Sequence, residues 1–228
     1  METNLEKGHE AQTEKPSLFG VITSPGVQFE RMRVKPVIGM PLIIVLAMII
    51  VGTVLQGLGM DYEALMRESG LTGQELEMAQ SFAAIGGIIG GIFAGVATLF
   101  IAPLIYWLCV KISGGTTTYK KMLSLTLFIS FITSLGLLIN GIVLYFTDTN
   151  SFYSVTSLAS LITSDQPLTS VLSAFEIFSI WGYVLLAIGL QKTGGISKKS
   201  AWISVIVLFV LMLLYSFITG FFNSQAGV

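Results

Sequence analysis

Residues 36–58 read PVIGMPLIIVLAMIIVGTVLQGL and contain no charged side chain. A helix needs about 20 such residues to cross the hydrocarbon layer of a bilayer, which is about 30 Å thick. Four more apolar stretches follow, at residues 82–110, 122–146, 168–190 and 201–222. Because backbone amides inside a bilayer must be hydrogen-bonded within their own segment, the pattern predicts an all-α, polytopic bundle of five transmembrane helices.

The charges between these stretches are sorted by sign. Lysine and arginine lie before the first stretch, between the second and third, and between the fourth and fifth, whereas the other loops are mostly acidic. Short basic loops stay in the cytoplasm, so we predict a cytoplasmic N-terminus, an outer C-terminus and a short outer tail at 223–228. A count of four spans would place basic loops on both sides. The basic residues are Lys7, Lys15, Arg31, Arg33, Lys35, Lys111, Lys120, Lys121, Lys192, Lys198 and Lys199, and the opposite loops contain Arg67, Asp61, Glu63, Glu68, Glu75, Glu77, Asp148 and Asp165.

Composition argues against several classes of function. The formal net charge is −1, which gives no electrostatic reason to expect a nucleic-acid partner. One cysteine, Cys109, and one histidine, His9, cannot form an internal disulfide or a Cys/His metal cage. The sequence has neither a phosphate-binding P-loop nor a G-x-S-x-G or H-E-x-x-H motif. We therefore expect no catalytic site, no cofactor and no metal.

The chain before the first stretch divides into two parts. Residues 1–16 are polar and charged and are predicted to form a disordered cytoplasmic tail. Residues 17–35 mix apolar with basic side chains, and Ser24 followed by Pro25 is typical of a helix start. This composition predicts an amphipathic segment in the membrane interface; the alternative is a plain positive-inside anchor. The segment contains Phe19, Pro25, Phe29, Arg31 and Arg33.

Glycines mark two further features. The pairs Gly114-Gly115 and Gly194-Gly195 each precede two lysines, which predicts two similar turns capped by left-handed glycine. In the second stretch, Gly87, Gly91 and Gly95 recur every four residues. Such spacing lets helices approach closely in lipid. These three glycines are therefore a candidate helix interface, either within the chain or with a partner or second copy.

Glu176 is the only charged side chain inside the five apolar stretches. A charge at that depth costs several kcal/mol unless it faces protein or water. Counting about 1.5 Å per residue from the basic turns places a polar layer at its depth, with Asn140 or Tyr215 as the expected partner. Two functions remain open for Glu176: a proton or cation site, or a hydrogen-bonded packing lock.

Four short motifs, taken in order, resemble the Yip-domain membrane proteins, whose eukaryotic members interact with Ypt/Rab GTPases. The similarity covers residues 17–222. The absence of a long cytoplasmic N-terminal region argues against a Rab-type role. The motifs are the opening FGVITSP at 19–25, Gly114-Gly115 with Tyr119, the run EIFSIW from Glu176 to Trp181, and the turn GISKK at 195–199.

The resemblance to the bacterial, bacillar branch of this family implies a non-catalytic accessory protein. Relatives of that kind accompany an ABC exporter of the macrolide-efflux type and help to protect cells from a toxic peptide. We therefore expect a multi-pass cell-membrane protein whose partners are lipids and the permease, ATPase and membrane-fusion subunits of an exporter. The alternatives are a stand-alone proton-coupled permease that uses Glu176, or a membrane-shaping protein that acts through residues 17–35.

Overall fold

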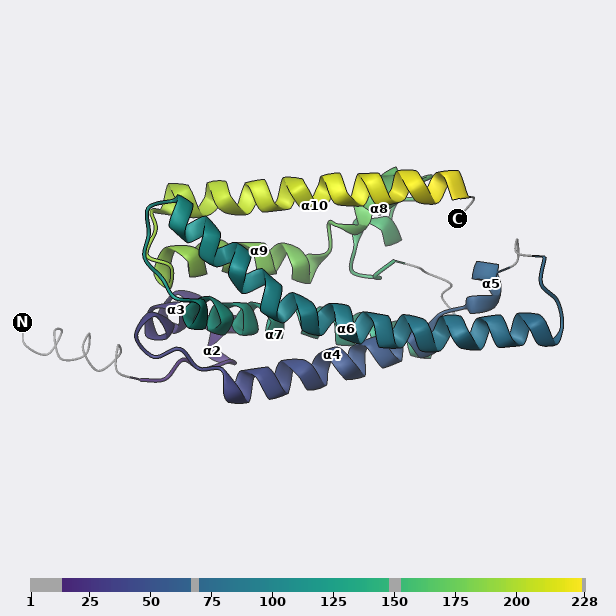
Figure 1. Ribbon diagram of the computed structural model, residues 1–228, viewed down its shortest axis with the longest axis horizontal. Helices are drawn as coiled ribbons and strands as arrows, with labels where there is room; N and C mark the ends of the chain where they lie inside the picture. Colours follow the sequence, from purple (N-terminus) through teal and green to yellow (C-terminus); the bar gives the residue numbers. More distant parts are fainter. Residues whose placement is uncertain (1–13, 67–69, 148–152, 227–228) are drawn as a thin grey trace, which may run out of the picture. The chain divides into compact units, whose positions relative to one another are not determined.

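The computed structural model describes residues 14–66, 70–147 and 153–226, and helices make up most of this part of the chain (Figure 1). The elements are α2 (Gly20–Thr23), α3 (Pro25–Val34), α4 (Gly39–Gly59), α5 (Tyr62–Met66), α6 (Gln74–Ile112), α7 (Tyr119–Phe146), η2 (Leu158–Ser160), α8 (Leu168–Ser173), α9 (Ile177–Lys192) and α10 (Lys198–Ala226).

Four of these helices, α4, α6, α7 and α10, are long and apolar enough to cross a membrane. They correspond to four of the five predicted stretches. The predicted outer tail at 223–228 overlaps the end of α10, which continues to Ala226, and residues 227–228 lie outside the described residues, so the outer tail remains a prediction. Neither proline nor glycine occurs between Phe221 and Ala226, so nothing in the sequence ends the helix earlier.

The fourth predicted stretch, 168–190, differs from expectation because it is not one continuous helix. It is divided into α8, which has 6 residues, and α9, which has 16. The interruption falls at Ala174–Glu176, where the only charged residue of the apolar stretches is located. The count of five spans and the orientation of the termini remain predictions.

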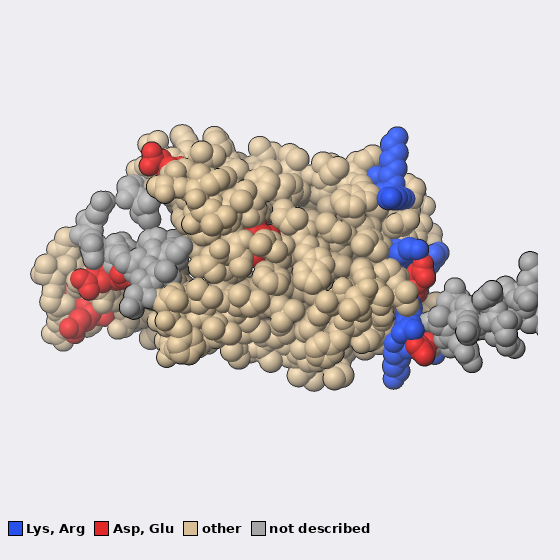
Figure 2. All heavy atoms as spheres, turned by 180° about the vertical axis from the view of Figure 1, so that it is seen from behind, with Lys and Arg blue, Asp and Glu red and all other residues tan. Residues whose placement is uncertain are grey.

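The chain forms two compact units. The first contains the described residues up to Leu46 with Ala97–Thr133 and Trp181–Phe209, and the second contains Ala47–Val96, Ser134–Ile180 and the described residues from Val210 onward. All lysines and arginines among the described residues belong to the first unit, where Figure 2 shows them gathered at one end. Lys7, His9, Arg67, Glu68 and Asp148, which the sequence analysis also used, lie outside the described residues.

The N-terminal segment packs into the first unit. Phe29 and Met32 on α3 are completely buried, and the Thr193 hydroxyl donates to the Phe29 carbonyl at 2.8 Å. The apolar side of α3 therefore contacts protein, whereas Phe19 before it is 69% exposed. An interfacial position for residues 17–35 remains a prediction.

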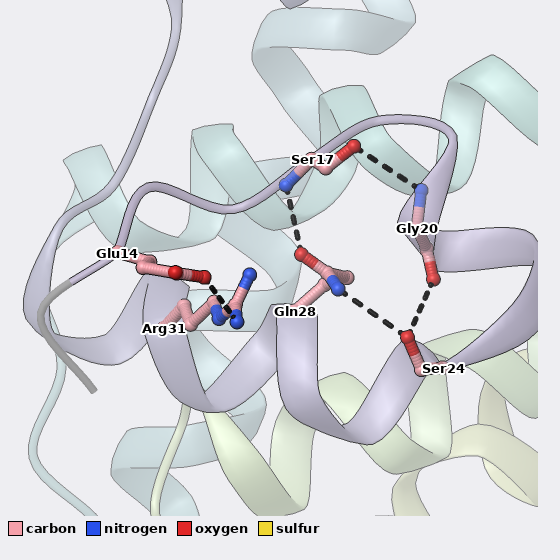
Figure 3. A network of polar contacts seen from close by, with 6 residues as sticks. All are labelled: Glu14, Ser17, Gly20, Ser24, Gln28 and Arg31. Carbon is pink, nitrogen blue, oxygen red and sulfur yellow. Dashed lines mark hydrogen bonds and ion pairs between the residues drawn. The ribbon is translucent and has the colours of Figure 1, made fainter. Parts of the chain in front are cut away.

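Polar contacts fix the start of this segment (Figure 3). The Gln28 side chain accepts from the Ser17 N–H at 2.8 Å and donates to the Ser24 hydroxyl at 3.4 Å. Pro25 begins α3 as predicted, but the Ser24 hydroxyl makes no cap bond to that helix and bonds the Gly20 carbonyl instead.

Ordered contacts also begin before residue 16, where the predicted disordered tail ends. The Glu14 carboxylate pairs with the Arg31 guanidinium at 2.5 Å (Figure 3), and Pro16 is buried. Glu14, within the predicted tail, therefore has a partner on α3, and the extent of the disordered tail remains a prediction. Residues 1–13 lie outside the described part of the chain.

The first basic turn ends α6 with a left-handed glycine. Gly114 has φ +75°. The Gly115 N–H donates to the Val110 carbonyl at 2.9 Å, and the Gly114 N–H donates to the Lys111 carbonyl at 3.1 Å. These two bonds form a Schellman motif, in which glycine avoids the steric cost of the left-handed region. The predicted glycine cap is confirmed here.

The second basic turn is capped in a similar way and lies against the first. Gly195 has φ +74°, and its N–H donates to the Gln191 carbonyl at 3.1 Å. A Cβ atom at Gly115 would lie 2.6 Å from Ile196 Cγ2. The two predicted turns therefore pack together in the first unit, and Gly115 lacks a side chain at their contact.

Tyr119, which belongs to one of the motifs above, joins the start of α7 to the middle of α6. Its hydroxyl donates to the Phe100 carbonyl at 3.0 Å. Pro103 lies inside α6, and a proline ring disturbs the helical bonding of the preceding turn. Tyr119 thus supplies a donor in the turn that Pro103 weakens.

Candidate functional site: the interruption between α8 and α9

Glu176 occupies the interruption of the fourth apolar stretch and is buried, with 8% of its surface exposed. Its carboxylate accepts from the Phe178 N–H at 3.0 Å and the Ser179 N–H at 2.7 Å. These are free N–H groups of the first turn of α9, so the Glu176 side chain caps that helix. The carboxyl group also lies at the end of the helix where the macrodipole is positive and favours an acceptor.

Thr156 supplies the third bond to this carboxylate. Its hydroxyl donates to Glu176 Oε1 at 2.7 Å. Among the described residues, the Glu176 side chain therefore accepts three hydrogen bonds and donates none. Such bonds are about twice as strong when the acceptor is ionised.

Asn140 on α7 completes the network through Thr156. Asn140 Nδ2 donates to the Thr156 hydroxyl at 2.9 Å and to the Gly136 carbonyl at 2.8 Å. Asn140 Oδ1 accepts from the Thr156 N–H at 3.2 Å. Both amide hydrogens and the amide oxygen are used, so Asn140, which is 4% exposed, is satisfied without water.

The backbone around the interruption is paired as well. The Leu158 N–H donates to the Phe175 carbonyl at 3.1 Å, and the Ile177 N–H donates to the Thr156 carbonyl at 3.2 Å. These two bonds form an antiparallel bridge between Ser157 and Glu176. The loop at 153–157 thus provides the hydrogen bonds that an unbroken helix would have made, as non-helical backbone within an apolar environment requires.

A small cavity lies beside this network. It measures ≈ 230 Å³ and is lined by Gln56, Met60, Asn140, Leu144, Tyr153, Ser154 and Val155. Sites for small molecules usually measure about 300–1,000 Å³. In size, the cavity suits water or a small ion better than a larger substrate.

The structure brings together only part of the predicted site. Asn140 is linked to Glu176, but through Thr156 rather than directly. Tyr215 is 64% exposed and makes no bond to Glu176 among the described residues. Trp181 is half-buried and belongs to the first unit, whereas the network lies in the second. Sequence reasoning missed Thr156 because it lies in a loop that has neither an apolar nor a charge pattern.

The predicted glycine interface on α6 faces α4 of the same chain. A Cβ atom at Gly91 would lie 2.8 Å from Thr53 Cγ2, and one at Gly95 would lie 2.8 Å from Ile49 Cγ2. A Cβ atom at Gly87 would have only the Tyr62 hydroxyl oxygen nearby, at 3.5 Å. These contacts correspond to the internal-packing alternative.

The neighbouring glycines Gly86 and Gly90 have open space. They lie one position before Gly87 and Gly91 and so point to another side of α6. In the residues around them, the large apolar side chains of Phe82 and Phe93 are 74% and 72% exposed. We call Phe82, Gly86, Gly90 and Phe93 the open α6 stripe.

A second close helix contact, which the sequence analysis did not identify, joins α4 and α7. A Cβ atom at Gly141 would lie 2.9 Å from the Gly52 carbonyl oxygen, and one at Gly59 would lie 2.8 Å from the Leu144 backbone. These neighbours are backbone atoms and cannot rotate away. Small residues that bring backbones this close are typical of helix packing in membranes.

Comparison with known proteins places the chain among membrane proteins. Residues 19–219 match the model of the Yip1 domain. Over 230 aligned residues, covering 100% of both chains, the sequence is 61% identical to the membrane protein YknW of Bacillus subtilis (strain 168). No solved structure matches the chain significantly.

Proposed function

The chain belongs to the Yip1-domain family of membrane proteins, and on this basis we propose that it is a non-catalytic, multi-pass accessory subunit of the cell membrane. In this role it assembles or stabilises an ABC exporter that protects the cell from a toxic peptide. Its partners would be the permease, ATPase and membrane-fusion subunits of that exporter. The resemblance to the bacillar branch supports this choice of partner.

The open α6 stripe is the observation that carries the proposal. Only 11% of the most apolar part of α6 is buried within the chain, compared with 56% for α7. Gly86 and Gly90 leave space for a second helix to approach closely, and Phe82 and Phe93 provide apolar contacts on either side. Gly87, Gly91 and Gly95 face the chain's own residues. We therefore assign the docking surface to the neighbouring side of α6.

Gly90→Leu is expected to abolish co-purification with the exporter while leaving the protein in the membrane. A leucine side chain would fill the space that a partner helix needs, and its Cβ would have no described atom of the chain within 4 Å. The measurement is affinity purification from native membranes in mild detergent, followed by mass spectrometry. The same strain should become as sensitive to the toxic peptide as one that lacks the protein.

Gly39→Leu is the matched control, because Gly39 also has open space but lies on α4. This variant should retain the exporter subunits. If Gly90→Leu retains them as well, the stripe is not the docking surface. Recovery of the wild-type protein with no exporter subunit would contradict the proposed partner, and recovery as a homo-oligomer would assign the stripe to a second copy.

The permease alternative has one observation in its favour. Interrupted helices, with polar groups at the ends of the half-helices, mark substrate and ion sites in many transporters, and Glu176 lies at such an end. Against it, the carboxylate is fully engaged with Thr156 and the first turn of α9.

For an accessory subunit, the purified protein in liposomes is expected to show no uptake driven by a pH gradient, and Glu176→Gln should change nothing in that assay. The measurement is fluorescence of a pH-sensitive dye trapped in the liposomes during an imposed gradient. Proton flux in the wild type that disappears in Glu176→Gln would establish the permease instead. For the membrane-shaping alternative, Phe19 and Val34 of residues 17–35 are 69% and 58% exposed, but Phe29 and Met32 are buried within the chain and cannot enter a membrane.

A further inference from the structure

A cleft in the first unit lies where the N-terminal segment meets the second basic turn. It measures ≈ 550 Å³ and is lined by Glu30, Arg33, Val34, Gln191, Lys192, Gly195 and Ile196. These residues come from the end of α3, the end of α9 and the turn before α10. The cleft is thus located at the ends of helices rather than along their apolar lengths.

The charges in the cleft leave one cation available. Lys192 Nζ pairs with Glu30 Oε1 at 2.5 Å. Arg33 is exposed, has no ion pair or hydrogen bond within the described part of the chain, and places its guanidinium about 3.3 Å from where a Cβ of Gly195 would be. The three charged side chains leave one net positive charge in the cleft, and it belongs to Arg33.

The surroundings increase the positive potential. Lys198 and Lys199 begin α10, and its first turn contains no acidic residue. Lysines at a helix N-terminus oppose the macrodipole, so an anion near this end of α10 would relieve an unfavourable arrangement. All other described lysines and arginines lie in the same unit.

One wall of the cleft is apolar. Val34 is 58% exposed although it is a large aliphatic residue. The exposed Val34 beside the unpaired Arg33 suits a ligand that has both a charged and an apolar part. A free phosphate ion would use only the charged part.

From this juxtaposition we propose that the cleft is a binding site for the phosphate group of an anionic phospholipid. Arg33 holds the phosphate, with two N–H groups suited to two phosphate oxygens, and the acyl chains leave the cleft along Val34. Lys192 is held back by Glu30 and contributes less. Anionic headgroups bind in this manner in basic pockets between transmembrane helices.

The proposal is tested with the full-length protein, purified in detergent and titrated with short-chain phosphatidylglycerol, with bound lipid counted by native mass spectrometry. Arg33→Ala should weaken binding at least tenfold, because it removes the charge-assisted bonds. Glu30→Gln should strengthen binding, because it removes a negative charge and releases Lys192. Arg33→Lys should fall between the wild type and Arg33→Ala.

Arg31→Ala is the matched control. It removes the same charge from the same helix, but Arg31 pairs with Glu14 and does not line the cleft. Equal weakening by Arg31→Ala and Arg33→Ala would reduce the effect to general surface charge and overturn the proposal. Competition by millimolar inorganic phosphate would assign the site to soluble phosphate, and equally tight binding of short-chain phosphatidylcholine would remove the preference for an anionic headgroup.

Discussion

Glu176→Ala is expected to lower the free energy of unfolding by about 4 kcal/mol. The change leaves the part-buried N–H groups of Phe178 and Ser179 and the Thr156 hydroxyl without their acceptor, and an unsatisfied buried group costs about 1–3 kcal/mol. The start of α9 and the loop at 153–157 should loosen together. The measurement is the unfolding midpoint of the purified protein in detergent.

Conservative replacements of Glu176 distinguish the effect of its carboxylate on stability from the effect of its side-chain volume. Glu176→Asp keeps a charged acceptor of the type favoured at helix starts and should retain most of the stability. Glu176→Gln has nearly the same shape, but one of its two carboxyl oxygens becomes an NH₂ group that can only face another donor. If Glu176→Gln were as stable as the wild type, the carboxylate would not be the lock that the geometry indicates.

A double-mutant cycle tests whether the network acts as one unit. Asn140 and Glu176 do not bond each other but share Thr156. Residues in one hydrogen-bond network usually show coupling energies of about 0.5–3 kcal/mol. The losses of unfolding free energy from Asn140→Leu and Glu176→Gln should therefore sum to more than the loss in the double variant. The effect of Tyr215→Phe, which lies outside the network, should simply add to that of Glu176→Gln.

Gly141→Ala is expected to lower the free energy of unfolding by about 1–3 kcal/mol, the usual cost of overpacking. The added methyl group would lie 2.9 Å from the Gly52 carbonyl oxygen, and only a shift of α4 or α7 could relieve this contact. Unfolding in a detergent series, followed by circular dichroism, would measure the change.

Gly86→Ala is the control, because it is expected to leave the free energy of unfolding unchanged or to raise it. Gly86 has open space, and alanine favours a helix over glycine by about 1 kcal/mol. This variant should be as stable as the wild type or slightly more stable. If Gly86→Ala and Gly141→Ala lowered the free energy of unfolding equally, α4 and α7 would be farther apart at Gly141 than in the structure.

The apolar stretches predicted four long helices because their signal is a simple one. Twenty or more residues without charge have few stable alternatives in lipid. The interruption at Glu176 could not be predicted in the same way, because residues 168–190 are as apolar as the other stretches apart from one side chain. What interrupts the helix is the partner at Thr156, some twenty residues away in a loop whose position no local pattern reveals.

The glycines show a similar limit. The spacing of Gly87, Gly91 and Gly95 predicted a helix surface able to approach another helix, but it did not indicate which one. Gly141 and Gly52 lie on different helices, and their meeting is visible only once α4 and α7 are packed. A glycine stripe within one helix is a local pattern, whereas a contact between single glycines is a property of the tertiary structure.

The length of α6 has a mechanical consequence. Its 39 residues extend for about 58 Å, while a bilayer with its headgroups is about 40–45 Å thick. If α6 crosses a bilayer, it must therefore tilt, bend at Pro103 or extend beyond the headgroups to accommodate its excess length.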